Sequence, residues 1–219
     1  MTGTRYTQFC ALARAAEIVA ERWTLLIIRE LLLAPMRFGD LEAKLDGISP
    51  ALLTTRLSAL VEHGVVRRTT LPAPFNAQVY ELTETGRAIQ PAIRELIRWG
   101  GRFLFPMRPD DTFDPDWVLL ALDAIARRTP TPSCCIGLRL PKIGGSATFT
   151  IEGGNQGTRV AKGEPARGPV IETRFEVFLQ ILAGEIKMTE AIAKREVRIE
   201  GSARTLARLP RLFELATAR

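Results

Sequence analysis

The sequence has few of the residues that build disulfide frameworks and metal centres. Its 219 residues include three cysteines and one histidine. Cys134 and Cys135 are adjacent, and adjacent cysteines rarely pair with each other. A single histidine and the lack of a Cys-x-x-Cys spacing argue against a zinc site. We therefore expect neither a disulfide scaffold nor a bound metal.

Long apolar runs are also missing. No stretch approaches the roughly 18–20 apolar residues that cross a bilayer, and the densest one ends at Arg29 and Glu30. The first residues lack the basic, apolar and small-residue regions of a signal peptide. With 46% hydrophobic and 25% charged residues, the composition is typical of a globular protein. We expect a bacterial-type cytoplasmic protein with no membrane contact.

Catalytic patterns are absent as well. The sequence has no nucleophile elbow, no Walker loop, no dinucleotide fingerprint and no paired carboxylates with supporting basic residues. We therefore expect no catalytic residues, no cofactor and no enzyme activity. The net charge of +6 and the pI of about 9.7 are compatible with an anionic partner. Basic residues are in equal excess before and after Pro106, so charge does not show which half would bind it.

Apolar periodicity in the first half predicts four helices. The first two span about 7–20 and 22–33, and a short third one carries Phe38. An Asp-Gly turn follows, and then Ser49 and Pro50 suit the N-cap and first position of a fourth helix. Gly64 is suited to end that helix.

Two short helices joined by a tight turn are typical of a helix-turn-helix. The side of the fourth helix away from its leucines carries small and polar residues, which can approach base edges in the major groove. A merely solvated face would usually carry more Glu and Lys. The candidate DNA contacts on this helix are Ser49, Pro50, Ala51, Thr54, Thr55, Arg56 and Ser58.

The residues after this helix predict a β-hairpin, the wing of a winged helix. Strands are expected at 65–69 and 79–82, joined by a turn that contains Asn76. Arg67 and Arg68 are candidates for phosphate or minor-groove contacts. We add Asn76 in the turn and Arg37 before the third helix to the candidate DNA contacts.

An apolar helix is expected from Thr83 toward Leu104, interrupted by Gly86 and Pro91. A single winged-helix core has little room for it. We expect it to pack, with the first helix, against a second copy of the chain. The two recognition helices of such a dimer would lie about 34–36 Å apart.

The second half predicts a small α+β domain. The proline-rich stretch after residue 105 suggests domains at 1–106 and 107–219. A helix is expected at 116–128, and alternating patterns predict a mostly antiparallel sheet covered by helices. Its strands are expected near 135–140, 147–151, 158–162, 170–173 and 197–199.

Several motifs of the first half resemble the HxlR family of winged-helix regulators. They are CALARA at 10–15, ERWTLLIIREL at 21–31, RFGDL at 37–41, ISPALLTTRL at 48–57 and VYELTETG at 79–86. The resemblance covers about residues 8–104 and implies a homodimer that binds palindromic DNA. Some members sense oxidants or electrophiles through an early cysteine, which makes Cys10 a redox-sensing candidate. The alternative for Cys10 is a small, semi-buried residue at the dimer interface.

The second half resembles the sterol carrier protein type 2 fold over about residues 133–215. The similarity is carried by PVIET at 169–173, FLQILAGE at 178–185 and EVRIEGS at 196–202. It implies an apolar tunnel for a lipid-like ligand, although aromatic residues at helical spacing are more often filled core. The candidate wall residues are Trp117, Phe149, Phe175, Phe178 and Met188.

Together these features predict a sequence-specific DNA-binding regulator that an apolar ligand modulates through the second domain. The alternative is a lipid or acyl carrier whose helical half only dimerises.

Overall fold

The computed structural model describes residues 5–104, 106, 108, 110–142 and 145–215. The chain divides into two compact units, Met1–Ile93 and Arg94–Arg219, and each is described by itself. Within the described residues, no helix has the length and apolar character needed to cross a membrane. The same residues contain no cluster of three or more His, Cys, Asp or Glu side chains able to hold a metal ion.

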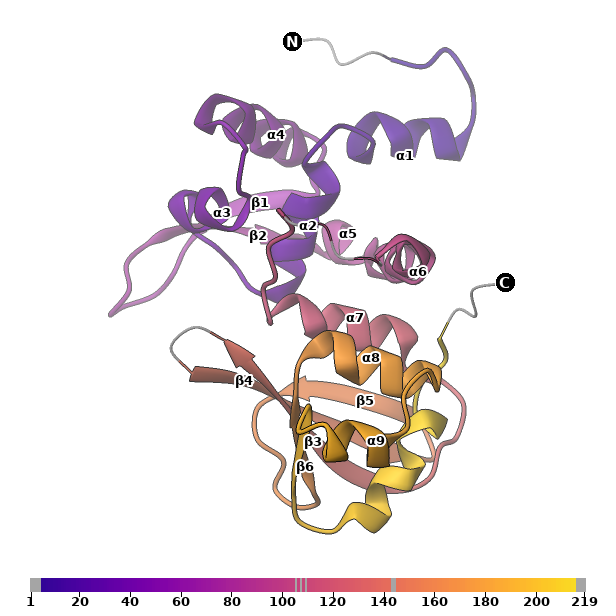
Figure 1. Ribbon diagram of the computed structural model, residues 1–219. Coiled ribbons are helices and arrows are strands. Elements are labelled where there is room, and N and C mark those ends of the chain that lie inside the picture. Colours follow the sequence, from indigo (N-terminus) through magenta and orange to yellow (C-terminus); the bar gives the residue numbers. More distant parts are fainter. Residues whose placement is uncertain (1–4, 105, 107, 109, 143–144, 216–219) are drawn as a thin grey trace. The chain divides into compact units, whose positions relative to one another are not determined.

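The first unit contains helices and one small sheet (Figure 1). Its elements, in chain order, are α1 (Ala11–Val19), α2 (Thr24–Leu33), α3 (Phe38–Lys44), α4 (Pro50–Glu62), β1 (Val66–Thr70), β2 (Gln78–Leu82) and α5 (Glu84–Arg87). Fully buried Ile27 and Ile28 of α2, Leu41 of α3 and Leu57 of α4 form its core. The core thus fixes the three helices α2, α3 and α4 against one another.

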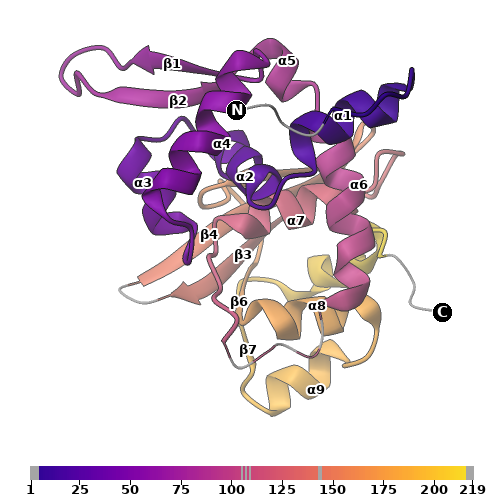
Figure 2. The same ribbon diagram turned by 90° about the horizontal axis from the view of Figure 1, so that it is seen from above.

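The sheet of this unit is the hairpin expected from the sequence, with one addition. β1 and β2 are antiparallel, with Val66 opposite Leu82 and Arg68 opposite Tyr80. Met36 adds a bridge on the free edge of β2, because its N–H donates to the Tyr80 carbonyl at 3.0 Å and its carbonyl accepts from the Tyr80 N–H at 2.8 Å. Figure 2 shows the hairpin extending beyond α3 and α4.

The first helix begins later than its apolar pattern suggests. The sequence predicts a start at residue 7, whereas α1 starts at Ala11, after an extended Cys10 with φ of −141°. The apolar stripe that motivates the prediction starts only at Leu12, so residues 7–10 carry no helical periodicity of their own.

The second unit is an α+β domain. Its helices are the carboxyl-terminal part of α6 (Gln90–Gly100), η1 (Gly101–Phe103), α7 (Trp117–Ile125), α8 (Phe175–Ala183), α9 (Met188–Ala193) and the 3-10 helix η2 (Ala203–Arg211). Its strands are β3 (Cys134–Lys142), β4 (Gly145–Gly154), β5 (Gly157–Lys162), β6 (Val170–Thr173) and β7 (Val197–Glu200). The strand order is β5-β4-β3-β6-β7, and all neighbours are antiparallel except the parallel pair β3 and β6.

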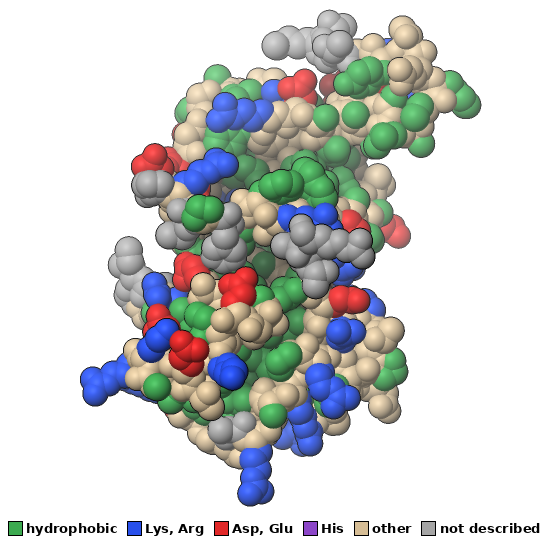
Figure 3. Space-filling model, turned by 45° about the vertical axis from the view of Figure 1, so that its right-hand side comes forward, with side chains coloured by type: hydrophobic (Ala, Val, Ile, Leu, Met, Phe, Trp, Pro, Cys, Tyr) green, Lys and Arg blue, Asp and Glu red, His purple; other side chains and the backbone are tan. Residues whose placement is uncertain are grey.

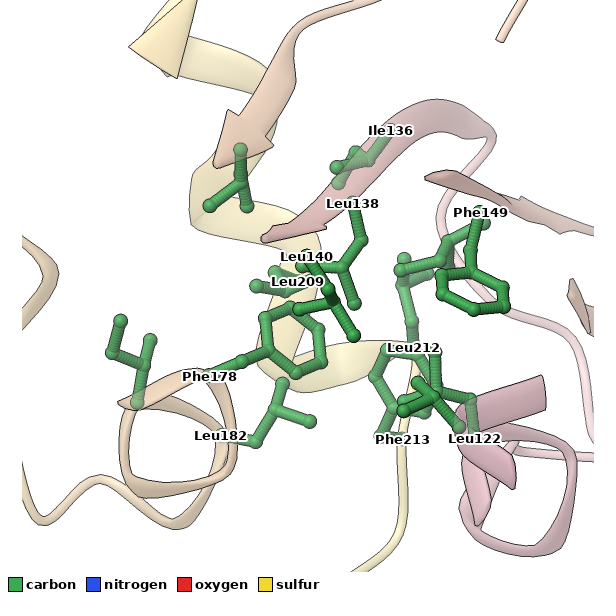
Figure 4. Packing of buried hydrophobic residues seen from close by; sticks show 14 of the residues in the cluster. Leu122, Ile136, Leu138, Leu140, Phe149, Phe178, Leu182, Leu209, Leu212 and Phe213 are labelled. Carbon is green, nitrogen blue, oxygen red and sulfur yellow. The ribbon is translucent and has the colours of Figure 1, made fainter. Parts of the chain in front are cut away.

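Apolar side chains fill the space between one face of this sheet and its helices (Figure 4). Leu138 of β3 and Phe149 of β4 point toward Phe178 of α8, Leu122 of α7 and Leu209 of η2, and all five are fully buried. On the other face, Arg139 forms ion pairs with Glu164 and Glu200 at 3.2 and 2.9 Å. The sheet therefore has one apolar and one polar face.

The division between the units lies inside α6, earlier than the break after Pro106 that the sequence suggests. Arg94 forms an ion pair with Asp123 of α7 at 2.7 Å, and Arg98 donates to the Ala124 carbonyl at 2.7 Å. These bonds attach the end of α6 to the second unit. The assignment of functional domains to 1–106 and 107–219 stays a prediction.

Candidate DNA-binding surface

The turn between α3 and α4 has the local chemistry that the sequence predicts. Gly47 has a φ of +86°, which L side chains rarely adopt. The Ser49 hydroxyl accepts a hydrogen bond from the Leu52 N–H at 3.3 Å and caps α4, and Pro50 occupies the first turn. Gly64, with a φ of +67°, follows the helix end. These devices fix where α4 begins and ends.

The outward side of α4 carries small uncharged residues. Ala51, Thr54 and Ser58 are exposed, as are Ser49 and Pro50 at its start. The Thr54 and half-buried Thr55 hydroxyls donate to the carbonyls of Pro50 and Ala51, both at 2.9 Å. Their hydrogens are therefore used within the helix, and they present methyl groups and acceptor lone pairs outward. Such a face can approach a base edge closely.

Arg56 does not belong to this outward group. Its Nη2 donates to Glu21 Oε2 at 2.7 Å and its Nε donates to the Arg22 carbonyl at 3.2 Å. Its side chain is 19% exposed. The sequence pattern indicated neither acceptor, because both lie more than 30 positions earlier.

The two arginines of β1 have different surroundings. Arg67 Nε donates to Glu81 Oε1 of the opposite strand at 2.8 Å, whereas the Arg68 guanidinium lies 5.2 Å from the centre of the Tyr80 ring. Because side chains alternate along a strand, the two arginines leave opposite faces of the hairpin. Both are exposed, and so is Asn76 in the wing turn, with a φ of +37°.

Arg37 lies beside the wing through the bridge made by its neighbour. Met36 pairs with Tyr80, which in turn pairs with Arg68. Arg37 itself is exposed and serves as the N-cap of α3, where its N–H donates to Asp40 Oδ2 at 3.3 Å. The structure thus places Arg37 next to the free edge of β2, whereas Arg68 lies on β1, on the other side of β2.

Cys10 is an exposed free thiol at the N-terminus of α1. The N–H groups of Ala13 and Leu12 lower the pKa of Cys10, because they stabilise its thiolate. By contrast, burial raises the pKa of Cys134 and of Cys135. Of the three thiols, Cys10 has the surroundings that favour reactivity.

Four of the five candidate ligand-wall residues lie in or against the core of the second unit. Phe149 and Phe178 are fully buried within it, Phe175 and Met188 are partly buried against it, and Trp117 is half-buried in the first turn of α7. Phe175 also stacks on Phe113, with ring centres 5.8 Å apart. Two surface hollows of this unit, beside the β4–β5 turn and beside Cys134, are lined by other residues. A ligand role for the five stays a prediction.

Comparison with known families points to the first half of the chain. The HxlR-like helix-turn-helix family model matches residues 18–107. An HTH-type transcriptional regulator of Mycobacterium tuberculosis, Rv3095, is 43% identical over 94 residues, which are 43% of this chain and 59% of that protein. This chain thus spans less than two thirds of that relative's length.

Two regulators of Bacillus subtilis are covered more completely. YvaP is 34% identical over 93 residues, which are 42% of this chain and 86% of YvaP. YodB is 34% identical over 92 residues, which are 42% of this chain and 82% of YodB. A solved structure of reduced YodB aligns with 46% of this chain and all of its own, at 31% identity and a TM-score of 0.40.

Proposed function

The chain belongs to the HxlR-like helix-turn-helix family, and from this premise we propose that it binds duplex DNA sequence-specifically as a homodimer and regulates transcription. The observation that carries the proposal is the outward side of α4. Its small uncharged residues follow a capped helix-turn-helix and are flanked by the exposed arginines of the wing and of α3. A helix face of small uncharged side chains can enter a major groove, and arginines at its sides can contact the two phosphate backbones.

Base reading is assigned to α4. Ala51, Thr54, Thr55 and Ser58 present methyl groups and hydroxyl oxygens, which fit thymine methyl groups and the amino groups of adenine or cytosine. Ser49 and Pro50 bring the N-terminus of α4 toward the groove, where its backbone N–H groups favour phosphate.

Phosphate contacts are assigned to the exposed arginines at the edge of the unit. Arg37 follows the bridge residue Met36 on one side of β2, Arg68 lies on β1 on the other side, and the turn with Asn76 extends beyond α3 and α4. Arg67 contributes less, because Glu81 already neutralises much of its charge. Phosphate contacts of this kind position the protein, and they carry no sequence information.

Dimerisation is assigned to the solvent-exposed apolar side chains of α1 and α6. Phe9 and Leu12 are largely exposed at the start of α1, and Leu96 and Trp99 are exposed on α6. Figure 3 shows hydrophobic side chains gathered over α1 at the upper right. Exposed apolar groups of this size are typical of protein interfaces. A C2 dimer would bring two α4 helices to one side of the duplex.

The experiment that tests this function is a selection of DNA sites by the purified protein from a random duplex pool. The enriched duplex and a scrambled duplex of equal composition are then titrated, with sedimentation to report the oligomeric state. Ala51→Glu should weaken binding to the enriched duplex roughly tenfold or more, because it places a negative charge against the phosphates. The matched variant Ala88→Glu, at an exposed alanine after α5, should bind as the unchanged protein does.

No enriched sequence, or equal effects of the two variants, would contradict this function. An apolar effector and a redox response of Cys10 remain predictions that the same titration can test, by adding fatty acids or a mild oxidant. The carrier alternative gains no support from the second unit, whose candidate wall residues Phe149 and Phe178 are packed in its core.

A further inference from the structure

Arg56 lies on the flank of α4 and not on its outward side. Each residue turns an α-helix by about 100°, so Arg56 projects roughly 140° away from exposed Ala51. Its guanidinium instead reaches the turn between α1 and α2, where it bonds to the Glu21 carboxylate at 2.7 Å and to the Arg22 carbonyl at 3.2 Å. A phosphate contact would require the Arg56 guanidinium to give up both of these hydrogen bonds.

The segment that Arg56 holds has an unusual backbone. Trp23 directly follows Arg22 and has a φ of +78°, in the left-handed region that L side chains rarely adopt. Its indole ring lies over the helix-turn-helix turn, since a Cβ atom built on Gly47 would be 3.8 Å from the ring. The Arg22 guanidinium covers the ring at 5.2 Å. The α1–α2 turn is thereby in contact with both the turn before α4 and the side of α4.

We infer that Arg56 is a positioning residue, which fixes the recognition helix against the α1–α2 turn through Glu21 and the Arg22 carbonyl and makes no phosphate contact. The inference rests on the proposed DNA-binding function. It adds Glu21, an acidic residue that no DNA-contact pattern includes, to the residues on which specific binding depends.

The two possible roles of Arg56 make opposite predictions for Glu21. If Arg56 bound phosphate, then removing the neighbouring carboxylate would release a cation and tighten binding to any duplex. If Arg56 positions α4, then removing the carboxylate loosens the helix and weakens binding to the selected duplex alone. The Glu21 side chain is 53% exposed, so Glu21→Gln should not impair folding.

The experiment titrates Arg56→Gln and Glu21→Gln with the enriched and the scrambled duplex at four salt concentrations. We expect each variant to weaken binding to the enriched duplex roughly three- to tenfold, the range of a partly buried charge-assisted bond. The scrambled duplex and the slope of log Kd against log salt should be unchanged. Glu84→Gln, at an exposed glutamate of α5, is the matched control and should change nothing.

Three results would overturn the inference while the unchanged protein still selects DNA. The first is a loss of slope of about 0.9 per protomer in Arg56→Gln, which reports a lost phosphate contact. The second is tighter binding by Glu21→Gln. The third is a double variant, Glu21→Arg with Arg56→Glu, that binds no better than Arg56→Glu alone, because a restored ion pair should recover part of the loss. If the unchanged protein selects no DNA, the proposed function fails first.

A DNA-free measurement separates positioning from general stability. Amide hydrogen exchange of the intact protein should speed up in Arg56→Gln at the α1–α2 turn and in the second turn of α4, which contains Arg56, and stay unchanged in α5. Uniform acceleration across the unit would mean that Arg56 is merely structural.

Discussion

The unequal roles of Arg67 and Arg68 give the sharpest prediction about the wing. Adjacent on β1, the two side chains leave opposite faces of the hairpin, and only Arg67 has a carboxylate partner, Glu81 at 2.8 Å, among the described residues. A cation that is already paired releases fewer counterions from DNA when it binds. Arg68→Gln should therefore lower the salt dependence of binding more than Arg67→Gln.

The expected change in salt dependence is worked out for one phosphate contact by the wing of each protomer. Loss of one phosphate contact lowers the slope of log K against log salt by about 0.9, and by about 1.8 for a dimer. Between 50 and 200 mM salt, Arg68→Gln should then lose roughly tenfold less affinity than the unchanged protein does. Arg67→Gln should change the slope by less than half as much.

Fluorescence anisotropy with a labelled duplex at five salt concentrations measures both slopes. Glu81→Gln provides a further check, because it releases Arg67 and should tighten binding at low salt. If Arg67→Gln lowered the slope and Arg68→Gln did not, the opposite face of the hairpin would be the one that faces DNA. The assignment by charge pairing would then be wrong.

Three further predictions concern stability and reactivity. Ser49→Ala removes the cap of α4 and should lower the free energy of unfolding by about 1 kcal/mol, as a shift of the urea midpoint; an unchanged midpoint would mean that the 3.3 Å bond contributes nothing. Phe178→Ala should lower the free energy of unfolding by about 3–5 kcal/mol, because it removes a fully buried side chain and leaves a cavity. A loss below 1 kcal/mol would indicate a loosely filled core with room for a ligand. Cys10 should be alkylated by iodoacetamide faster than Cys134 and Cys135 at neutral pH, because its lowered pKa gives more thiolate there; equal rates by mass spectrometry would refute this.

Local sequence signals predict most of the elements. The helix-turn-helix is marked by Ser49, Pro50 and Gly64, whose capping and turn preferences act within a few residues. The fourth strand of the second unit is predicted at 170–173 and observed there, where β-branched residues follow the turn residues Gly168 and Pro169. These elements are predictable because the interactions that set where they begin and end involve residues close in sequence.

The contacts that the sequence does not predict involve partners that are distant in sequence. The acceptors of Arg56 lie at Glu21 and Arg22, more than 30 positions earlier, and only tertiary packing brings them to its side chain. Local sequence patterns also do not predict the bridge between Met36 and Tyr80, because the two residues are far apart in the sequence. The opposite directions of Arg67 and Arg68, by contrast, follow from strand alternation and could have been drawn from the sequence.

The most direct test of the central claim is a titration of the purified protein with the DNA upstream of its own gene, at several salt concentrations and with unrelated DNA as competitor. Our account predicts tight binding that resists the competitor and weakens as salt rises. Weak binding that is equal for both DNAs at every salt concentration would contradict it.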